Sequence, residues 1–117
     1  MIDNTSTALF NVECGIGSSA GMTINYTIKT QAGAGNESHT EVGTLEVMIA
    51  NDNVTTVSVT KSHSSQLITD TGTYTVTFEA STANPSVISI MADSTLNVNS
   101  KISYVIINKD EQVITQL

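Results

Sequence analysis

One segment of the chain has the residues of a nucleophile elbow. Gly17-Ser18-Ser19-Ala20-Gly21 matches the pattern G-x-S-x-G, and Asp52 and His63 follow it in the order of a hydrolase's acid and base. In that pattern the central serine, here Ser19, lies on a tight turn that a following helix holds in place. Residues 22–30 instead alternate apolar and polar side chains as a strand does. We therefore expect a flexible loop, no catalytic residue and no enzyme activity.

The same glycines fit the fingerprint of dinucleotide-binding proteins. Gly15-Ile16-Gly17-Ser18-Ser19-Ala20 has the spacing G-x-G-x-x-G/A. The pyrophosphate in such a site binds at the N-terminus of the next helix, because free backbone N–H groups face the anion there. Since a strand is expected after this segment, the sequence predicts no nucleotide cofactor and no other cofactor.

Two histidines and a glutamate are the candidate metal ligands. His39 and Glu41 are close in sequence, and His63 lies in a serine-rich stretch farther along the chain. A metal site needs three or four converging ligands and further residues that orient them. The spacing indicates no such convergence, and Cys14 is the single cysteine. We expect the two histidines and Glu41 to be exposed polar residues, and we predict no metal site.

Length and charge restrict the class of protein further. The chain has 117 residues, with 11 acidic side chains, 4 lysines, no arginine and a net charge of −7. Nucleic acids and anionic membranes bind basic surfaces, so neither is expected as a partner. The polarity comes mainly from 18 Thr, 14 Ser and 10 Asn. This composition, rather than glycosylation, explains four Asn-x-Ser/Thr sequons, at Asn4, Asn25, Asn36 and Asn53.

Alternating apolar and polar residues predict strands along most of the chain. The pattern is clearest at residues 23–28, 45–49, 57–59, 73–78, 87–90 and 101–108. Asn51-Asp52-Asn53 is expected to connect a hairpin, residues 62–65 to end its second strand, and Asp70-Thr71-Gly72 to connect a second hairpin. Residues 101–108 carry apolar side chains on both faces and are expected to be buried on both. We predict an all-β fold, an antiparallel, jelly-roll-like β-sandwich of eight or nine short strands.

A single sandwich domain is expected over residues 13–117, preceded by an N-terminal arm or first strand over residues 1–12. The first residues lack a clear alternation, and a docking arm that orders against a neighbour would use Ile2, Leu9 and Phe10. A small, glycine-rich loop between two strands is the candidate contact loop, because such loops are exposed. It comprises Gly33, Ala34, Gly35, Asn36 and Glu37.

The order of the expected strands, from about Gly21 to Asn108, resembles a β-rich module of tailed-bacteriophage virion proteins, such as tail-fibre, appendage and head-decoration proteins. The segments similar to its strands are 24–28, 43–49, 55–60, 72–80, 87–92 and 101–105. Such modules often have an aspartate-glycine turn where this chain has Asn51-Asp52-Asn53. The resemblance implies structural or adhesive service on a particle, as a homo-oligomer such as a trimer, and carries over no catalytic residue.

The expected function is that of a non-enzymatic virion structural protein: a small capsid-decoration, tail-accessory or fibre-type component, or a domain of a longer fibre. It is expected on the virion surface or an appendage and to be soluble when isolated. Strand edges rich in Thr, Ser and Asn lack the charges that guard against pairing, so copies of itself or other virion proteins should cover them. The alternative is a carbohydrate-binding or host-receptor-recognition module with a host-surface glycan as partner. Sugar sites usually need exposed aromatic residues, and the chain has no Trp, three Tyr and two Phe.

Overall fold

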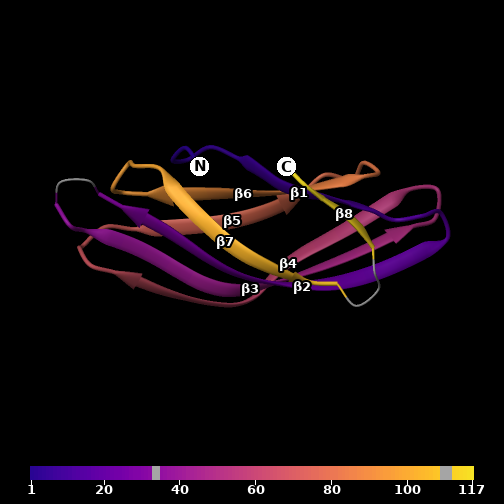
Figure 1. Cartoon of the computed structure of the whole chain (residues 1–117), viewed down its shortest axis with the longest axis horizontal. Helices are drawn as coiled ribbons and strands as arrows, with labels where there is room; N and C mark the ends of the chain where they lie inside the picture. The colour runs from indigo at the N-terminus through magenta and orange to yellow at the C-terminus, as the bar shows by residue number, and fades with distance from the viewer. Residues whose placement is uncertain (33–34, 109–111) are drawn as a thin grey trace.

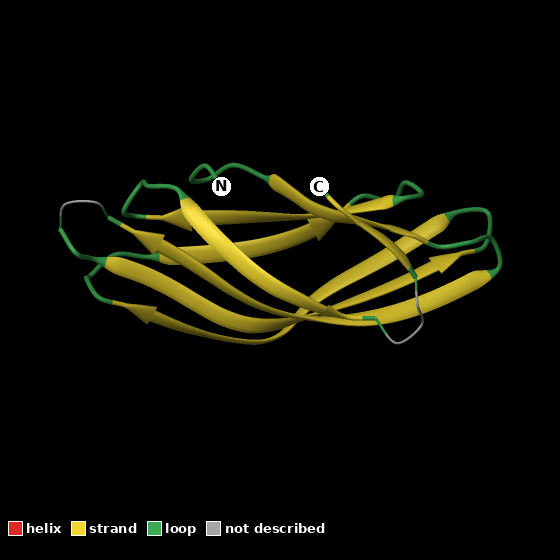
Figure 2. Cartoon of the chain, in the orientation of Figure 1, coloured by secondary structure: helices red, strands yellow, loops and turns green. Residues whose placement is uncertain are grey.

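Alternation of inward apolar and outward polar residues places most of the chain in strands. The computed structural model describes residues 1–32, 35–108 and 112–117, and this part of the chain contains no helix (Figure 2). The strands are β1 (Thr7–Glu13), β2 (Ser18–Gln31), β3 (Ser38–Asn51), β4 (Thr55–Ile68), β5 (Tyr74–Ala80), β6 (Ser86–Ser94), β7 (Ser100–Ile107) and β8 (Val113–Gln116). The all-β class is confirmed, although β2, β3 and β4 have 14 residues each and are longer than expected.

The strands form two antiparallel sheets that pack face to face (Figure 1). Sheet A has the strand order β5-β6-β1-β8, and sheet B has the order β4-β3-β2-β7. The meander β2–β3–β4, with β7 returning beside β2, gives sheet B the strand order of a Greek key. The pairs β1–β8 and β2–β7 are nested, as in a jelly roll. The molecule is an elongated β-sandwich with extents of 52 × 21 × 18 Å.

The core lies between the sheets and takes every second residue of each strand. On β3 the inward residues include Leu45, Val47 and Ile49, and on β6 they include Ile88 and Ile90, all of them buried. Outward positions carry mostly threonine, serine and asparagine. The hydroxyl-bearing side chains therefore lie largely on the surface, while valine, isoleucine and leucine side chains form most of the core.

β4 continues through the serine-rich stretch that was expected to end it. Ser62 is the extra residue of a β-bulge, at which the pairing of β4 with β3 shifts by one residue. The bulge absorbs this residue and the ladder resumes beyond it, so the strand extends to Ile68. The expectation that residues 62–65 end the strand is wrong, because serine side chains do not interrupt the backbone pairing.

The turn at residues 70–72 does not connect a hairpin. β4 belongs to sheet B and β5 belongs to sheet A, so the chain crosses from one layer to the other between them. The sequence locates this turn correctly, but its residue types do not specify which sheet receives the next strand. The prediction of a second hairpin here is wrong.

β7 is buried on one face only. Ile102, Tyr104 and Ile106 pack against the core, whereas Val105 is 65% exposed and Ile107 is 40% exposed. In the part of the chain that the structure describes, no further layer covers the outer side of sheet B. The expectation of two buried faces is therefore wrong, and apolar side chains face the solvent on this side.

The N-terminal segment is built into the sandwich. β1 pairs with β6 on one side and with β8 on the other, and its Leu9 and Phe10 lie in the core. The assignment of these two residues to a docking arm is corrected, because the chain's own strands already cover them. Ile2 is exposed. The terminal amino group of Met1 donates to the Ser100 carbonyl oxygen at 2.8 Å, which holds the start of the chain against β7.

Edge strand β4 has two features that disfavour pairing with another strand, an inward-pointing lysine and a bulge. The Lys61 ammonium points between the sheets, where Nζ donates to the Val76 carbonyl oxygen of β5 at 2.6 Å. An inward lysine and a bulge each disfavour the addition of a further strand to an edge. The expectation that the edges lack guarding charges is therefore wrong for the centre of β4.

Gly43 leaves room for a core tyrosine, and this packing can be tested. It lies on β3 opposite Tyr26, and an added Cβ would lie 2.6 Å from the His63 carbonyl oxygen and would overlap the Tyr26 hydroxyl. Gly43→Ala is expected to lower the free energy of unfolding by about 1–3 kcal/mol, because overpacking displaces the backbone. Guanidinium-induced unfolding followed by circular dichroism measures the change.

Gly21→Ala is the matched control on the neighbouring strand. An added Cβ there would have its nearest neighbour, the Val47 carbonyl oxygen, at 3.8 Å, which is an ordinary contact. Its unfolding free energy should stay the same or rise slightly, since alanine restricts the unfolded chain. Equal stabilities of the two variants would show that Tyr26 does not depend on the glycine.

Candidate functional site

Two polar networks lie inside the sandwich, and both are built on β3. His39 is fully buried and Glu41 is only 1% exposed, although charged side chains are rarely buried without partners. Both follow the phase of Leu45, Val47 and Ile49, because the odd-numbered positions of β3 face the core. The expectation that His39 and Glu41 are exposed is wrong. Their shared phase with the apolar residues was the signal that could have found them.

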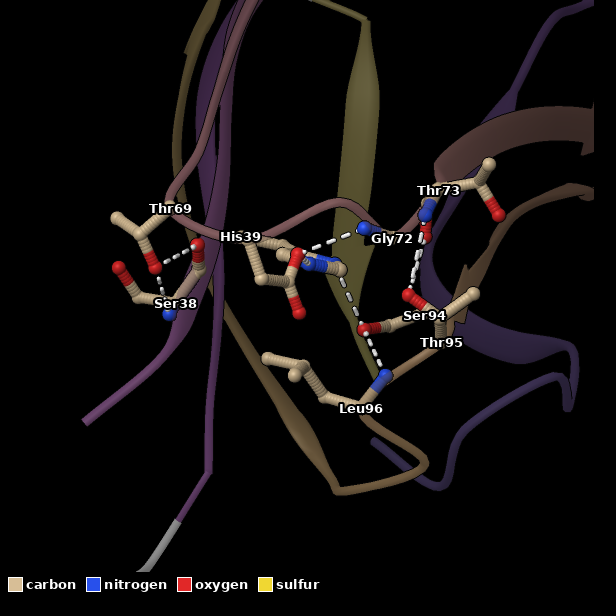
Figure 3. A network of polar contacts seen from close by, with 9 residues as sticks. Ser38, His39, Thr69, Gly72, Thr73, Ser94, Thr95 and Leu96 are labelled. Carbon is tan, nitrogen blue, oxygen red and sulfur yellow. Dashed lines mark hydrogen bonds and ion pairs between the residues drawn. The ribbon is translucent and has the colours of Figure 1, made fainter. Parts of the chain in front are cut away.

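The first network, here called the His39 network, joins β3 of sheet B to β6 of sheet A (Figure 3). His39 Nε2 lies 2.8 Å from Asp70 Oδ1, and Nδ1 lies 2.9 Å from Ser94 Oγ. The Gly72 N–H donates to Asp70 Oδ1 at 2.9 Å, and the Leu96 N–H donates to Ser94 Oγ at 3.1 Å. All these groups are satisfied when Nε2–H donates to Asp70 and Nδ1 accepts from the Ser94 hydroxyl.

The His39 network has the residue types of a Ser-His-Asp triad. In a triad the histidine takes a proton from the serine, and the carboxylate orients the histidine. Ser94 is only 1% exposed, however, and its backbone N–H is held by Asp3 Oδ1 at 2.9 Å. An acyl group cannot reach a hydroxyl that the core covers. What this arrangement can do is tie the two sheets together.

The second network, here called the Glu41 network, surrounds a buried carboxylate. Tyr26 OH donates to Glu41 Oε2 at 2.7 Å, and Lys61 Nζ donates to the same oxygen at 3.1 Å. Gln66 Nε2 donates to the other oxygen, Oε1, at 2.9 Å. A buried carboxylate is tolerated when its charge and its lone pairs have partners. Here both oxygens have them.

Lys61 and Gln66 also bind the opposite sheet. Lys61 Nζ donates to the Val76 carbonyl oxygen at 2.6 Å, and Gln66 Nε2 donates to the Tyr74 carbonyl oxygen at 2.8 Å. The two side chains come from β4, the edge strand of sheet B, and the two carbonyls belong to β5, the edge strand of sheet A. The Glu41 network therefore closes one side of the sandwich.

Two buried tyrosines, Tyr26 and Tyr74, are held in the protonated form. Burial, the hydrogen bond to Glu41 and the charge of Glu41 raise the pKa of Tyr26 above its ordinary value. Burial also raises the pKa of Tyr74, whose hydroxyl oxygen accepts from Thr30 Oγ1 at 3.1 Å. Both hydroxyls thus remain neutral groups within the core rather than nucleophiles or bases.

The residues of the serine elbow do not meet. Ser19 on β2 pairs with Ala50, and His63 on β4 pairs with Thr44. Ala50 and Thr44 lie six residues apart on β3, or about 20 Å, and Asp52 is in the loop beyond the end of that strand. β2 begins at Ser18 and contains Ser19 and Gly21, so a strand lies where either glycine motif would need a helix. The expectation of a flexible loop over residues 17–21 is therefore wrong from Ser18 onward, because these residues pair with β3.

The candidate metal ligands do not converge. His63 pairs with Thr44 on the exposed side of sheet B, whereas His39 and Glu41 face the core. Within residues 1–32, 35–108 and 112–117, no three His, Cys, Asp or Glu side chains are grouped so as to hold a metal ion. Cys14 is buried, and its Sγ lies 3.5 Å from the Ser18 carbonyl oxygen.

The candidate contact loop connects β2 and β3 at one end of the sandwich. Gly33 and Ala34 lie outside the described residues. Gly35 and Asn36 are exposed and Glu37 is half-buried. Asn36 has a φ of 58°, a left-handed conformation that asparagine tolerates well. A contact role for this loop stays a prediction.

The described part of the chain has no helix that is long and apolar enough to cross a bilayer. The chain was compared with protein-family models, with curated proteins and with solved structures, and none of them matches it.

The Glu41 network gives a prediction for stability. Lys61→Met removes the cation but keeps the apolar stem, and it leaves the Glu41 carboxylate buried with two neutral donors. We expect the free energy of unfolding to fall by about 2–4 kcal/mol, because an uncompensated buried charge is costly. Chemical unfolding at neutral pH measures this loss.

The control for this change is Glu79→Met, which removes a charge at an exposed position of β5 and should alter stability by less than about 0.5 kcal/mol. Adding Glu41→Gln to Lys61→Met removes the unpaired charge and should recover part of the loss. A double variant less stable than Lys61→Met alone would contradict the charge as the cause.

The His39 network makes stability depend on pH. The hydrogen bond from His39, helped by the Gly72 N–H, holds the pKa of Asp70 below its ordinary value of 3.8. Because the folded pKa is the lower one, this carboxylate contributes stability above about pH 4 that is lost as the pH falls through the folded value. The stability advantage of the wild type over Asp70→Asn should therefore be constant near neutral pH and shrink below pH 4. Unfolding curves over this range measure it.

Ser94→Ala is the control, because it removes the other partner of His39 and leaves Asp70 in place. Its loss of stability relative to the wild type should not shrink in the acid range. If the difference between the wild type and Asp70→Asn were the same at every pH, the bond between His39 and Asp70 would not stabilise the fold.

Proposed function

We propose that the protein is a non-enzymatic structural component of a tailed-bacteriophage particle that acts through protein–protein contacts, as a small capsid-decoration, tail-accessory or fibre-type protein. The order of its strands, which resembles that of such virion modules, motivates the class. The observation that carries the proposal is an extended, uncovered surface on one side of the sandwich.

This surface, here called the outer face, consists of the outward residues of β4, β3, β2 and β7. Its hydroxyl-bearing residues are Ser19, Thr23, Thr27, Thr40, Thr44, Thr56, Ser58, Thr60, Ser65 and Ser103. Its exposed apolar residues are Val42, Met48, Leu67, Val105 and Ile107. Protein interfaces combine apolar and hydrogen-bonding groups and are depleted of charge at their centre. The composition of the outer face fits that description.

The side chains that could act as catalytic acids, bases or nucleophiles form hydrogen bonds inside the molecule. His39, Glu41 and Ser94 are buried and hydrogen-bonded, and every buried side-chain nitrogen and oxygen in the described residues has a partner. An active site would need such groups to converge on a space that a substrate can enter. Their use as internal connections supports a structural role.

The aromatic residues favour protein contacts over a sugar site. Phe10, Tyr26 and Tyr74 are buried, and Phe78 and Tyr104 pack partly buried against the core. A sugar ring usually stacks on an aromatic side chain that is free on the surface, and all five aromatic residues of this chain are engaged in its core. A glycan-binding module is therefore the weaker alternative.

The proposal predicts that the protein is incorporated in purified phage particles through its outer face. Mass spectrometry of washed particles of the phage that encodes the chain should detect its peptides in many copies. Val105→Asp, which places a charge on the outer face, should reduce incorporation at least about tenfold, because a buried unpaired charge opposes association.

Thr75→Asp is the matched control, since Thr75 is exposed on the outward side of β5 in sheet A. It should be incorporated like the wild type, and thermal unfolding should show that both variants fold. Particles that contain no peptide of the chain would contradict the proposed function. Equal incorporation of both variants would contradict the role of the outer face.

A further inference from the structure

The outer face carries half of the exposed large apolar side chains in the described chain, five of ten. Met48 and Val42 lie along β3, Ile107 and Val105 along β7, and Leu67 on β4. Isolated apolar residues on a surface need no explanation, but several of them on one sheet face mark an interaction site. This concentration indicates that the outer face is covered in the working form of the protein.

The charges of the outer face are few and unevenly placed. Lys29 and Lys101 are direct cross-strand partners on β2 and β7, and both are exposed. Like charges that face each other across strands destabilise a sheet, so two of only 4 lysines lie where they repel each other. Glu46 is the exposed acid of β3 on the same face. A carboxylate of another molecule, bound between the two lysines, would relieve this repulsion.

The spacing of these charges selects a geometry. Lys29 pairs with Thr40, which lies six residues from Glu46 on β3, or about 20 Å. A two-fold axis across the strands at the level of Gly43, midway between Thr40 and Glu46, would bring the lysine pair of each copy to Glu46 of the other. A two-fold axis parallel to the strands would instead place Lys29 and Lys101 of both copies at the same level along the strands. Repulsion between these four lysines disfavours that arrangement.

We propose that two copies of the chain pair through their outer faces about this two-fold axis, with Lys29 and Lys101 of each copy facing Glu46 of the other. The apolar side chains then lie between the sheets, which pack as the two layers of a sandwich do, about 10 Å apart. Two-fold dimers with self-complementary surfaces are the commonest oligomers. This inference names the partner and contacts of the surface on which the proposed function rests.

The strand edges favour pairing through the face rather than through an added strand. On one side Lys61 and Gln66 bind the carbonyl oxygens of β5 and connect the two sheets. On the other side β8 has only four residues, and Tyr104 OH donates to the Leu9 carbonyl oxygen at 3.3 Å across the sheets. Short, bulged or occupied edges are poor templates for another strand.

The size of the outer face sets the strength of the expected dimer. Four strands about 4.8 Å apart, overlapping over about ten residues, cover about 600 Å² on each copy. The total of about 1,200 Å² is at the lower limit for stable interfaces. The dimer should therefore dissociate on dilution, and its charge pairs should contribute visibly to its affinity.

A charge exchange tests the inference. Sedimentation equilibrium over a wide range of protein concentration should show a monomer–dimer equilibrium for the wild type. Glu46→Lys should weaken the dimer by at least about tenfold, since it replaces attraction by repulsion at two symmetric contacts. Lys29→Glu should weaken the dimer less, because Lys101 still faces Glu46 of the other copy. The double variant with both changes keeps the net charge of the wild type and should bind more tightly than Glu46→Lys alone, because the carboxylate introduced at position 29 then attracts the ammonium introduced at position 46 of the other copy.

Glu79→Lys, on β5 at the opposite face of the sandwich, is the matched control and should leave the equilibrium unchanged. Weakening by Glu79→Lys but not by Glu46→Lys would overturn the inference, because it would place the contact on sheet A rather than on the outer face. A double variant as weak as Glu46→Lys, or a wild type that stays monomeric at all concentrations, would also overturn it.

A cross-link gives a second measurement that does not depend on charge. Cys14 is buried and the chain has no other cysteine, so Val42→Cys introduces one accessible thiol close to the proposed axis. A short bis-maleimide should join two copies of this variant, and it should not join copies of Thr75→Cys. Equal yields would overturn the face-to-face arrangement. Particle incorporation that depends on Val105 while both dimer tests fail would leave the proposed function standing without this partner.

Discussion

The burial of one carboxylate, that of Glu41, constrains much of the surrounding structure. Its two oxygens need donors and its charge needs a cation, and the requirement is met by Tyr26, Lys61 and Gln66. Tyr26 can lie where it does because β3 has a glycine opposite it, Gly43. Lys61 has to turn inward from an edge strand, next to the bulge of β4. The packing of the core, the shape of an edge and the link between the sheets thus depend on the same group.

The His39 network shows why residue types and distances do not by themselves make an active site. Its serine and its aspartate each lie within hydrogen-bond distance of its histidine, as in a hydrolase. The difference is access, since Ser94 is covered by the core. A catalytic constellation needs a space in which the reacting atom of a substrate can lie next to the nucleophile. Without that space, the same hydrogen bonds act as a tie between β3 and β6.

The buried networks connect the edges of the two sheets and leave the outer face of sheet B uncovered, and this is how the core bears on the proposed function. Lys61 and Gln66 use the carbonyls of β5, so that one pair of sheet edges is engaged within the molecule. Sheet B is left with an uncovered outward side that carries hydroxyl groups, Val42, Met48 and few charges. Association through a face leaves the backbone pairing of both copies intact, whereas association through an edge would add to it. A protein with this arrangement can form a closed pair without extending into an aggregate.

Most of the strands could be predicted from the alternation of side chains, because a period of two follows from backbone geometry alone. The sequence also indicated the tight turns, as at Asn53, which has a φ of 72°. The alternation could not predict that β4 and β5 lie in different sheets or that the outer side of β7 is uncovered. For His39 and Glu41 it indicated the side of the strand, but not the partners that allow these side chains to be buried. Alternation separates two faces but does not say which of them another layer will cover. That depends on contacts between strands far apart in the chain, and a polar residue is buried only where those contacts supply its partners.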